Sequence, residues 1–580
     1  MTTATRPLFF ARLAGTQTEM GAQHGRLTAS DAARLLAFYR TMPERMLAGD
    51  LPLPGKLAVR ALATAWQARL ARSRPPELAA RTRAFAEAVA ASEPGHDVES
   101  AVRAFAVMDS LQNCVSLAAR ARIGPFASPL ARRATVAAVP ACSTVIAWGR
   151  TTEDGELLFA RNFDFPGVGV WDAAPAFVVC EPDRGQRYGF FTTRGADTPV
   201  VTLVNEAGLV IAPHTRWHAD VTWGGAMIVD LVHEIARRAE TVADAIAIAR
   251  ARPSSSSWGI AIGSARERTG AVLELAGPHL DVVRPATGAD HLVCANRYRS
   301  PKLADGELAA SAAWELHSGR RERRLRALVE GRAAPLSPAD LVRFLGDRRD
   351  PCAPEHARQF GAIVAQADNV HAVVVAPAAL RAWVGVDRAP TCEGTWAELA
   401  WTWDGPPGGW ELRDGALVSV GASSSPQEPG FEARLRTDLA SPHSEVSRHV
   451  HEAARALEQA HDVPRARAAI ERAVAVDPHD PSLRLIACWL SLEGGAPERA
   501  LAHVDAGLAR ETESYRRGQL LLWGARAARR IDPARARRFS EELDRLTSDD
   551  THDGLVELRA RARERHRGRP HPNLMLVDAY

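Results

Sequence analysis

The order of helix-like and strand-like segments constrains the fold of this 580-residue chain more than any other feature. Residues 17–120 carry helical periodicity with few strand signals. From residue 142 the chain changes to short β-rich runs, such as STVIAWG and ELLFARNF, which Gly, Asp and Pro separate. Helical patterns return at 225–251 and 306–346, and each is followed by further strand-like runs. We therefore expect an α+β domain in which helices cover layered sheets.

Beyond residue 444 the pattern is almost wholly helical, and it repeats. Ala466, Ala500 and Ala534 are each 34 residues apart, and each lies in a helical stretch rich in small residues. A period of 34 residues is that of tetratricopeptide helical hairpins, although most of their aromatic signature is absent here. We expect tetratricopeptide-like repeats, with a plain helical bundle as the alternative.

These patterns divide the chain into five parts. The run GASSSPQEPG has the composition of a linker. We expect a helical N-terminal segment, a strand-rich domain, a linker, an all-α repeat domain and a charged tail, over residues 1–141, 142–420, 421–443, 444–550 and 551–580 respectively.

The charge and hydropathy of the chain exclude some classes of function. Its 72 basic and 69 acidic residues nearly cancel and form no concentrated basic footprint, so no nucleic-acid partner is expected. No segment approaches about eighteen uninterrupted apolar residues, so no membrane span is expected. The N-terminal MTTATRPLFFARLAG has no continuous apolar core and is not a good signal peptide. The seven cysteines are scattered and never form CxxC, a pattern typical of reduced thiols in a cytoplasmic protein.

One cysteine stands out because of the residues that follow it. Cys142 heads an apolar run, and Arg161 and Asp164 lie about one hairpin further along. A catalytic thiol must be partly ionised near neutral pH, which requires a nearby cation or base. If the Ala141–Cys142 bond were cut, the new α-amine, with an ordinary pKa near 8, would be that base.

In this interpretation Arg161 stabilises negative charge on the sulfur, and Asp164 orients the new ammonium. Residues three apart alternate faces on an ideal strand, so a bend or bulge near Asn162 would be needed to bring both to Cys142. The alternative, from spacing alone, is a buried strand cysteine beside a surface ion pair.

Five short motifs add to this reading, and their order along the chain is informative. They are ACSTVIAWGRTTEDGELLFARNFDF from residue 141, AGTQTEMGAQHG (14–25), LVNEAGLVIAP (203–213), LVCANRY (292–298) and SGRRERRLRAL (318–328). Together they resemble the acyl-coenzyme A:6-aminopenicillanate acyltransferase family of self-processing N-terminal-nucleophile hydrolases, over most of residues 8–400. The resemblance implies a four-layer αββα core and autocatalytic cleavage before Cys142. Residues 1–141 would then stay bound as a small chain.

The resemblance also implies roles for single residues. Cys142 would be the nucleophile, and Arg161 and Asp164 would shape its thiolate and its amine. Asn205 and Asn296 would place amide donors at the oxyanion, where one donor is typically worth about 3 kcal/mol.

The helix motif and the junction complete the expected site. Arg321 is the candidate for the arginine of the Ser-x-x-Arg-x-x-Arg helix, and Arg324 is the second choice. Ala141 stands where the penicillin-linked enzyme more commonly has glycine, but alanine is small enough to tolerate a twisted scissile peptide.

The sequence therefore predicts a self-processing cysteine amidase or acyltransferase. It would take an acyl group from a small amide or thioester onto Cys142 and pass it to water or to an amine. A lipid-directed amide or ester hydrolase on the same scaffold is one alternative. Another is a catalytically inactive scaffold whose helical repeats bind a protein or peptide partner. No nucleotide cofactor is expected, since PGVGVW (166–171) lacks the full nucleotide-binding fingerprint. No metal is expected either, because the cluster of His443, His449 and His451 has no cysteine or carboxylate at ligand spacing.

Overall fold

A computed structural model of the chain describes residues 8–47, 53–120, 141–220, 222–308, 312–404, 410–413, 416–419, 442–547 and 554–564. Residues 421–441 of the predicted linker and 565–580 of the predicted tail lie outside the described residues. In the described part, no helix is long and apolar enough to cross a membrane.

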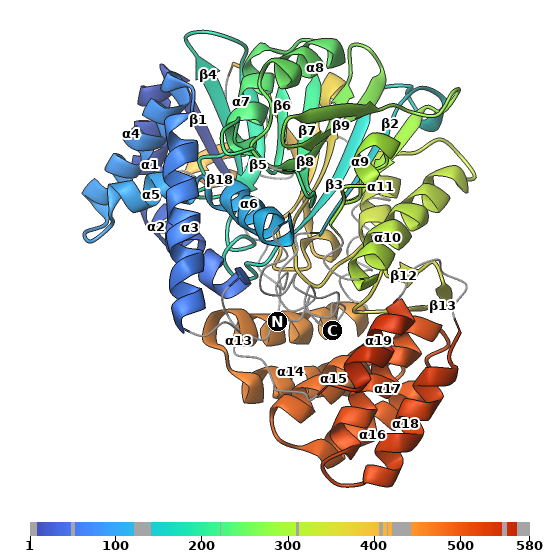
Figure 1. Cartoon of the computed structure of the whole chain (residues 1–580). Coiled ribbons are helices and arrows are strands. Elements are labelled where there is room, and N and C mark those ends of the chain that lie inside the picture. Colours follow the sequence, from blue (N-terminus) through green and yellow to red (C-terminus); the bar gives the residue numbers. More distant parts are fainter. Residues whose placement is uncertain are drawn as a thin grey trace.

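A ten-stranded sheet forms one half of the central body (Figure 1). Its neighbouring strands are antiparallel except for β1 and β4, which pair in parallel. The strands, in spatial order, are β10 (His279–Val283), β9 (Thr269–Ala276), β8 (Ser257–Ser264), β7 (Leu209–Thr215), β6 (Thr202–Asn205), β5 (Tyr188–Thr193), β4 (Pro175–Pro182), β1 (Phe9–Gly15), β18 (Ala416–Ser419) and β17 (Trp410–Arg413).

A six-stranded antiparallel sheet forms the other half. Its strands, in spatial order, are β11 (His291–Cys294), β2 (Ala141–Ala147), β3 (Leu158–Asp164), β14 (Asn369–Ala376), β15 (Arg381–Gly385) and β16 (Trp396–Ala400). The strand-like runs predicted between residues 142 and 403 are confirmed as strands of these two sheets. A short separate pair, β12 (Arg349–Asp350) and β13 (Ala353–Ala357), lies outside them.

The two sheets pack face to face over a shared apolar core. Ile146 and Phe159 of the smaller sheet contribute to it, as do Phe177 and Val210 of the larger sheet. Helices cover both outer faces: α7 (Ile228–Arg238) and α8 (Val242–Ala251) pack on the larger sheet, and α10 (Ala312–Glu330) and α11 (Pro338–Leu345) on the smaller one. Because β2 and β3 are covered on both faces, every residue of these two strands is buried. The layers therefore follow the predicted order, helix, sheet, sheet, helix.

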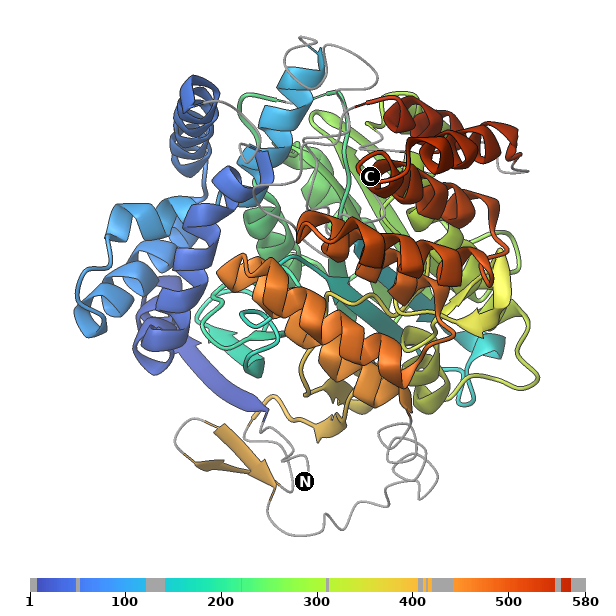
Figure 2. The ribbon, with the colours of Figure 1, turned by 90° about the horizontal axis from the view of Figure 1, so that it is seen from below.

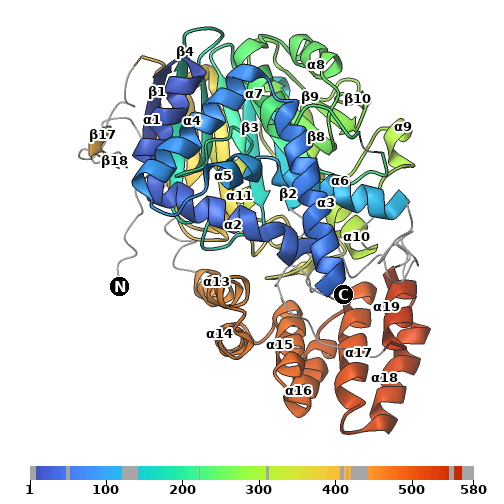
Figure 3. The ribbon, with the colours of Figure 1, turned by 60° about the vertical axis from the view of Figure 1, so that its left-hand side comes forward.

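The helices predicted within residues 17–120 are confirmed where the structure describes that range, but the N-terminal segment also contributes a strand that the sequence did not predict. Residues Phe9–Gly15 form β1 inside the larger sheet, with Phe9 and Leu13 buried on one face and Phe10 on the other. A strand of alternating burial is stable only when another sheet or helix covers each face, which the sequence of this short run does not reveal. The helices that follow flank the sheets (Figure 3). They are α1 (Gln17–Leu27), α2 (Ala29–Leu47), α3 (Leu53–Arg72), α4 (Pro76–Ser92), α5 (Val98–Ala104) and α6 (Val107–Arg120), and a short α9 (Pro301–Ala304) follows later in the chain.

The C-terminal region is helical and lies against one end of the sheets (Figures 1 and 2). Ala466 and Ala500 are fully buried four residues after their helix caps, whereas Ala534 is exposed and Ala536 takes the equivalent place. The predicted repeat is thus two residues out of register in its third unit. Within the predicted charged tail, the described residues include a packed helix, since Leu555 and Leu558 of α19 are buried. The helices are α13 (Pro442–Ala460), α14 (Val463–Val476), α15 (Pro481–Glu493), α16 (Pro497–Leu508), α17 (Ser514–Ala528), α18 (Pro533–Arg545) and α19 (Gly554–Ala562).

Candidate active site

Cys142 lies in β2 with its side chain on the face that meets the larger sheet. Thr144, two residues on and therefore on the same face, contacts His214 of β7 (Oγ1 to Nε2, 2.8 Å). The guanidinium of Arg161, from the neighbouring strand β3, donates to the Cys142 sulfur over 3.4 Å and to the carbonyl of Pro213 over 2.6 Å. Cys142 and Arg161 are both about 1% exposed, so this contact is sealed from solvent.

Three buried arginine–cysteine contacts occur in the part of the chain that the structure describes. They differ in whether a carboxylate forms an ion pair with the arginine. Arg216, which touches Cys294, forms a buried ion pair with Glu274. Arg81, which touches Cys180, forms a buried ion pair with Asp197, in which the donor and acceptor are 2.5 Å apart. The same described ranges show no ion pair for Arg161, and its Nε and Nη1 have no hydrogen-bond partner there. The positive charge of Arg161 therefore acts mainly on the Cys142 sulfur and more weakly on Cys294 and Asp164.

The pKa of the Cys142 thiol reflects two opposing effects. Burial raises it above its ordinary value, while Arg161 and, more weakly, Arg321 lower it and Asp164 raises it further. The Cys114 thiol is affected by burial alone, which raises its pKa to about 12. The Cys294 thiol lies beside Arg216, whose charge Glu274 neutralises, and burial raises the pKa of this thiol to about 11. Of the three buried cysteines that contact an arginine, Cys142 is thus the one whose arginine forms no ion pair with a carboxylate among the described residues.

Asn296 and Arg321 meet at the backbone of Cys142. The Cys142 amide donates to Asn296 Oδ1 over 2.7 Å, and Asn296 Nδ2 donates to the carbonyl of Thr215 over 3.0 Å. Arg321 donates through Nη1 to the Cys142 carbonyl (2.8 Å) and to Ser143 Oγ (2.8 Å), and through Nη2 to Asn296 Oδ1 (3.0 Å). Every one of these groups is buried, so the peptide at Cys142 is fixed by charge-assisted bonds.

One face of α10 supplies this arrangement. Ser318 and Arg321 are three residues apart and therefore share a face. The backbone N–H of Asn296 donates to Ser318 Oγ over 2.9 Å. Arg324 lies on a different part of the helix and is ion-paired with Asp347 (2.7 Å). The structure therefore brings Arg321, and not Arg324, to Cys142.

Asp164 lies on the opposite face of β3 from Arg161. The β2–β3 register runs without a shift from Ala141 opposite Asp164 to Ala147 opposite Leu158, so the expected bulge near Asn162 is absent from this hairpin. Alternation alone then sends Arg161 to the sulfur and Asp164 to the side of Arg321. The backbone amide of Asp164 still hydrogen-bonds the sulfur.

The Asp164 carboxyl is one of two buried acids here. Asn369 donates to its Oδ1 over 2.8 Å, but Oδ2 has no partner among the described residues. Burial raises the pKa of Asp164 to about 7, against the opposing effects of Arg321 and Asn369. Burial and the nearby carboxylates of Asp164 and, more weakly, Glu458 together raise the pKa of Asp368 well above its ordinary value. Neither oxygen of Asp368 has a hydrogen-bond partner within the described ranges.

Asn205 is elsewhere, which contradicts its predicted role at the oxyanion. Its Nδ2 donates to the carbonyls of Ala236 and Ala239 at the end of α7, and its Oδ1 accepts from the amide of Leu209. Both ends of the amide are thus engaged by the backbone. Asn205 caps the β6–β7 turn and ties it to the outer helix layer.

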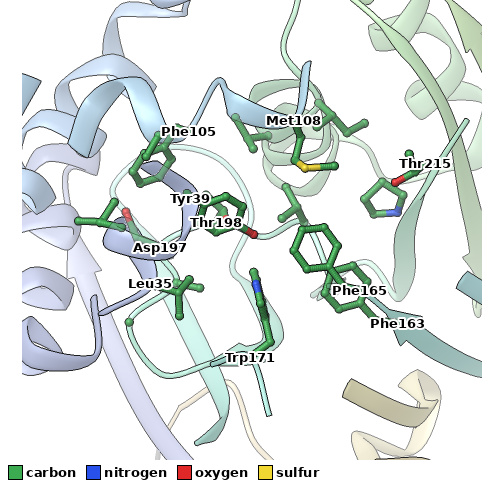
Figure 4. A pocket seen from close by; sticks show the side chains of 18 of the residues that line it. Leu35, Tyr39, Phe105, Met108, Phe163, Phe165, Trp171, Asp197, Thr198 and Thr215 are labelled. Carbon is green, nitrogen blue, oxygen red and sulfur yellow. The ribbon is translucent and has the colours of Figure 1, made fainter. Parts of the chain in front are cut away.

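An apolar pocket opens beside these residues (Figure 4). It is joined to the site by Phe163, opposite Cys142 in the hairpin, and by Pro213 and Thr215, whose carbonyls accept from Arg161 and Asn296. The charged residue on its wall, Asp197, is ion-paired with Arg81. Aromatic and aliphatic side chains make up most of the rest, among them Leu35, Tyr39, Phe85, Phe105, Met108, Phe165, Trp171, Ile228 and Trp258.

Sequence reasoning missed Asp368 and Asn369, which join the site from the start of β14. Their signal in the sequence is a pair of polar residues, Asp-Asn, immediately before the strand-like run VHAVVVAP. Such a pair is also what an ordinary turn before a strand looks like, so only the pairing of β14 with β3 separates the two.

Comparisons with known proteins add little to this geometry. No protein-family model matches the chain, and no curated protein matches it. Among solved structures, one similar chain is the Caenorhabditis elegans N-acylethanolamine-hydrolyzing acid amidase (NAAA) ortholog. It is 14% identical, the alignment covers 41% of this chain and 93% of that one, and the TM-score is 0.30.

Proposed function

We propose that this chain is a self-processing cysteine amidase or acyltransferase with Cys142 as its nucleophile. The observation that carries the proposal is the unneutralised guanidinium of Arg161 on the buried Cys142 sulfur, with Asn296 and Arg321 bonded to the backbone of the same residue. A structural cysteine needs none of these contacts. A nucleophile needs a cation at its sulfur and a rigid frame around it. The resemblance of the junction to self-processing N-terminal-nucleophile hydrolases points the same way.

In the cleavage step, the Cys142 sulfur attacks the carbonyl carbon of Ala141. The bond from that carbon to the Cys142 nitrogen breaks as the new carbon–sulfur bond forms, which gives a thioester and a free amine. Water then hydrolyses the thioester, so that Ala141 ends in a carboxylate and the thiol of Cys142 is restored.

The surroundings of the Cys142 nitrogen suit the ammonium that this cut would create. Asn296 Oδ1 already accepts from that nitrogen, and Asp164 stands opposite Ala141 with one carboxylate oxygen that no described residue engages. Two buried acids side by side, Asp164 and Asp368, disfavour ionisation of both. A new positive charge would relieve that repulsion, and this is a physical reason for the pair to be there.

In turnover, the free amine of Cys142 takes the thiol proton and the sulfur attacks the acyl carbon of the substrate. The amine then returns the proton to the leaving nitrogen or thiol, and water or an amine releases the acyl group. Asn296 Nδ2 has two N–H donors and uses one on Thr215, which leaves the second for the acyl oxygen. The apolar pocket would hold the acyl chain, so we propose an apolar acyl group.

The test is the mass of the purified protein under denaturing conditions. We expect two pieces, residues 1–141 and 142–580, from the wild type and one intact chain from Cys142→Ala. Cys294→Ala is the matched control, since Cys294 also touches a buried arginine, and it should cut like the wild type. An uncut wild-type chain whose Cys142 does not react with thiol reagents would favour the inactive scaffold instead.

A further inference from the structure

The segment 165–172 joins β3 to β4 and forms part of the pocket wall. Phe165 and Trp171 both line the pocket (Figure 4). Their rings lie 5.9 Å apart at 73°, and Phe163 stacks on Phe165 at 5.2 Å. The position of this segment, which we call the pocket loop, therefore sets the shape of the pocket next to the hairpin that carries Cys142.

Helix α13 of the C-terminal region holds the pocket loop by its backbone. The carboxylate of Glu458 accepts from the amides of both Gly167 and Val168, each over 3.0 Å. Gln459 Nε2 donates to the carbonyl of Val168 over 3.1 Å. Hydrogen bonds from backbone amides to a carboxylate are charge-assisted and stronger than neutral ones.

Two glycines allow this close approach. Gly169 has φ +87°, and a Cβ there would lie 2.2 Å from Gln459 Nε2. Gly167 has φ +146°, and a Cβ there would lie 2.9 Å from Cδ1 of Trp171. The loop thus fits between α13 and the pocket only with glycine at these positions.

The C-terminal region has other anchors that do not involve Glu458. Arg358, before β14, forms a buried ion pair with Glu511 (2.6 Å), and the amide of Gln359 donates to Asp480 over 2.7 Å. Arg320, beside Arg321 on α10, pairs with Glu513 over 3.0 Å. A change at Glu458 therefore releases the pocket loop without detaching the helical region.

We propose that α13 sets the acyl-chain selectivity of this protein by holding the pocket loop, with Glu458 as the positioning residue. This rests on the proposed function, because it assigns the pocket to the acyl group. Glu458 does not touch the reacting atoms. It fixes the loop backbone, the loop fixes Phe165 and Trp171, and these rings contact the distal part of a long acyl chain. A short acyl group does not reach them.

The experiment compares p-nitrophenyl acetate and p-nitrophenyl decanoate as acyl donors. We expect Glu458→Ala to keep kcat/KM for the acetate within about twofold and to lower it for the decanoate by about tenfold, mainly through KM, as for other losses of apolar pocket contacts. Glu458→Gln keeps one acceptor oxygen and should fall between. Glu452→Gln is the matched control, because Glu452 lies on the same helix but pairs with the exposed Arg472, and it should behave like the wild type.

A second measurement needs no turnover. In a Cys142→Ala background, binding of 11-(dansylamino)undecanoic acid should weaken about tenfold on Glu458→Ala and remain unchanged on Glu452→Gln. Equal losses for both esters, or an unchanged ratio together with unchanged probe binding, would overturn the inference. If neither ester acylates the wild type, but Glu458→Ala still weakens binding of the dansyl probe, the proposed function fails and the positioning role of α13 stands.

Discussion

Replacing Arg161 tests the electrostatic reasoning about Cys142 most sharply. The guanidinium nitrogen and the sulfur are 3.4 Å apart, and both residues are about 1% exposed, so solvent hardly screens them. Two unit charges at this separation interact with about 5 kcal/mol at an effective dielectric constant of about 20. In Arg161→Gln this stabilisation of the thiolate is lost, so the pKa of the Cys142 thiol should rise further.

The expected change in reactivity is smaller than the change in pKa. A more basic thiolate is intrinsically more nucleophilic, with a Brønsted slope of about 0.4–0.5, so alkylation at neutral pH should slow by about a hundredfold. The assay is the rate of iodoacetamide labelling of Cys142 between pH 6 and pH 10, followed by peptide mass spectrometry. Arg161→Lys retains the charge and should stay within about tenfold of the wild type.

The result that would refute this reasoning is a wild-type labelling rate and pH dependence in Arg161→Gln. Thermal unfolding of both variants separates a lost charge from a lost fold, because Arg161 also donates to Pro213. If Arg161→Lys and Arg161→Gln lose reactivity together with their thermal transition, the effect is structural.

Three further predictions concern buried polar groups. Burial raises the pKa of Asp109 to about 6. Because the folded state then binds this proton more tightly than the unfolded state, the free energy of unfolding should fall by about 2 kcal/mol between pH 4 and pH 7, and urea titrations of Asp109→Asn should lack that fall. The pKa of Asp164 is about 7, so self-cleavage should slow as the pH drops below 7 and the carboxylate is protonated, and this acidic limb should be absent from whatever cleavage remains in Asp164→Asn. Arg321→Lys loses at least one charge-assisted bond to Cys142, Ser143 or Asn296, so the free energy of unfolding should fall by about 2–3 kcal/mol.

Each of these has an outcome that contradicts it. A pH-independent stability difference between the wild type and Asp109→Asn would mean that its carboxyl does not titrate in this range. Cleavage by Asp164→Asn with the wild-type pH profile would remove Asp164 from the reaction. An Arg321→Lys variant as stable as the wild type would show that lysine satisfies all three acceptors.

The sequence predicted the central hairpin well, because local rules determine it. The apolar run after Cys142, the Asp-Gly turn region and the run that ends at Asp164 specify two paired strands. The bulge expected near Asn162 is absent, because the register of these strands is continuous. The motif resemblance also placed Arg321 before Arg324, and the structure brings Arg321 to Cys142.

The errors arise where long-range packing decides. β1 is a strand because it pairs with β4 and β18 and packs into the core on both faces, although the segment that follows it is helical. Asn205 follows a strand as a catalytic asparagine would, yet α7 supplies carbonyls that engage its amide. Asp368 and Asn369 enter the site only because β14 pairs with β3 more than 200 residues away in the chain.

The central claim is that Cys142 carries the acyl group, and the most direct test is to trap it there. The protein is mixed with p-nitrophenyl decanoate, quenched in acid within seconds and digested. The mass of the peptide that begins at Cys142 is then measured by mass spectrometry. We expect a decanoyl thioester on that peptide in the wild type, which hydroxylamine removes, and none in Cys142→Ala. A decanoyl group on any other residue while Cys142 remains free would contradict it.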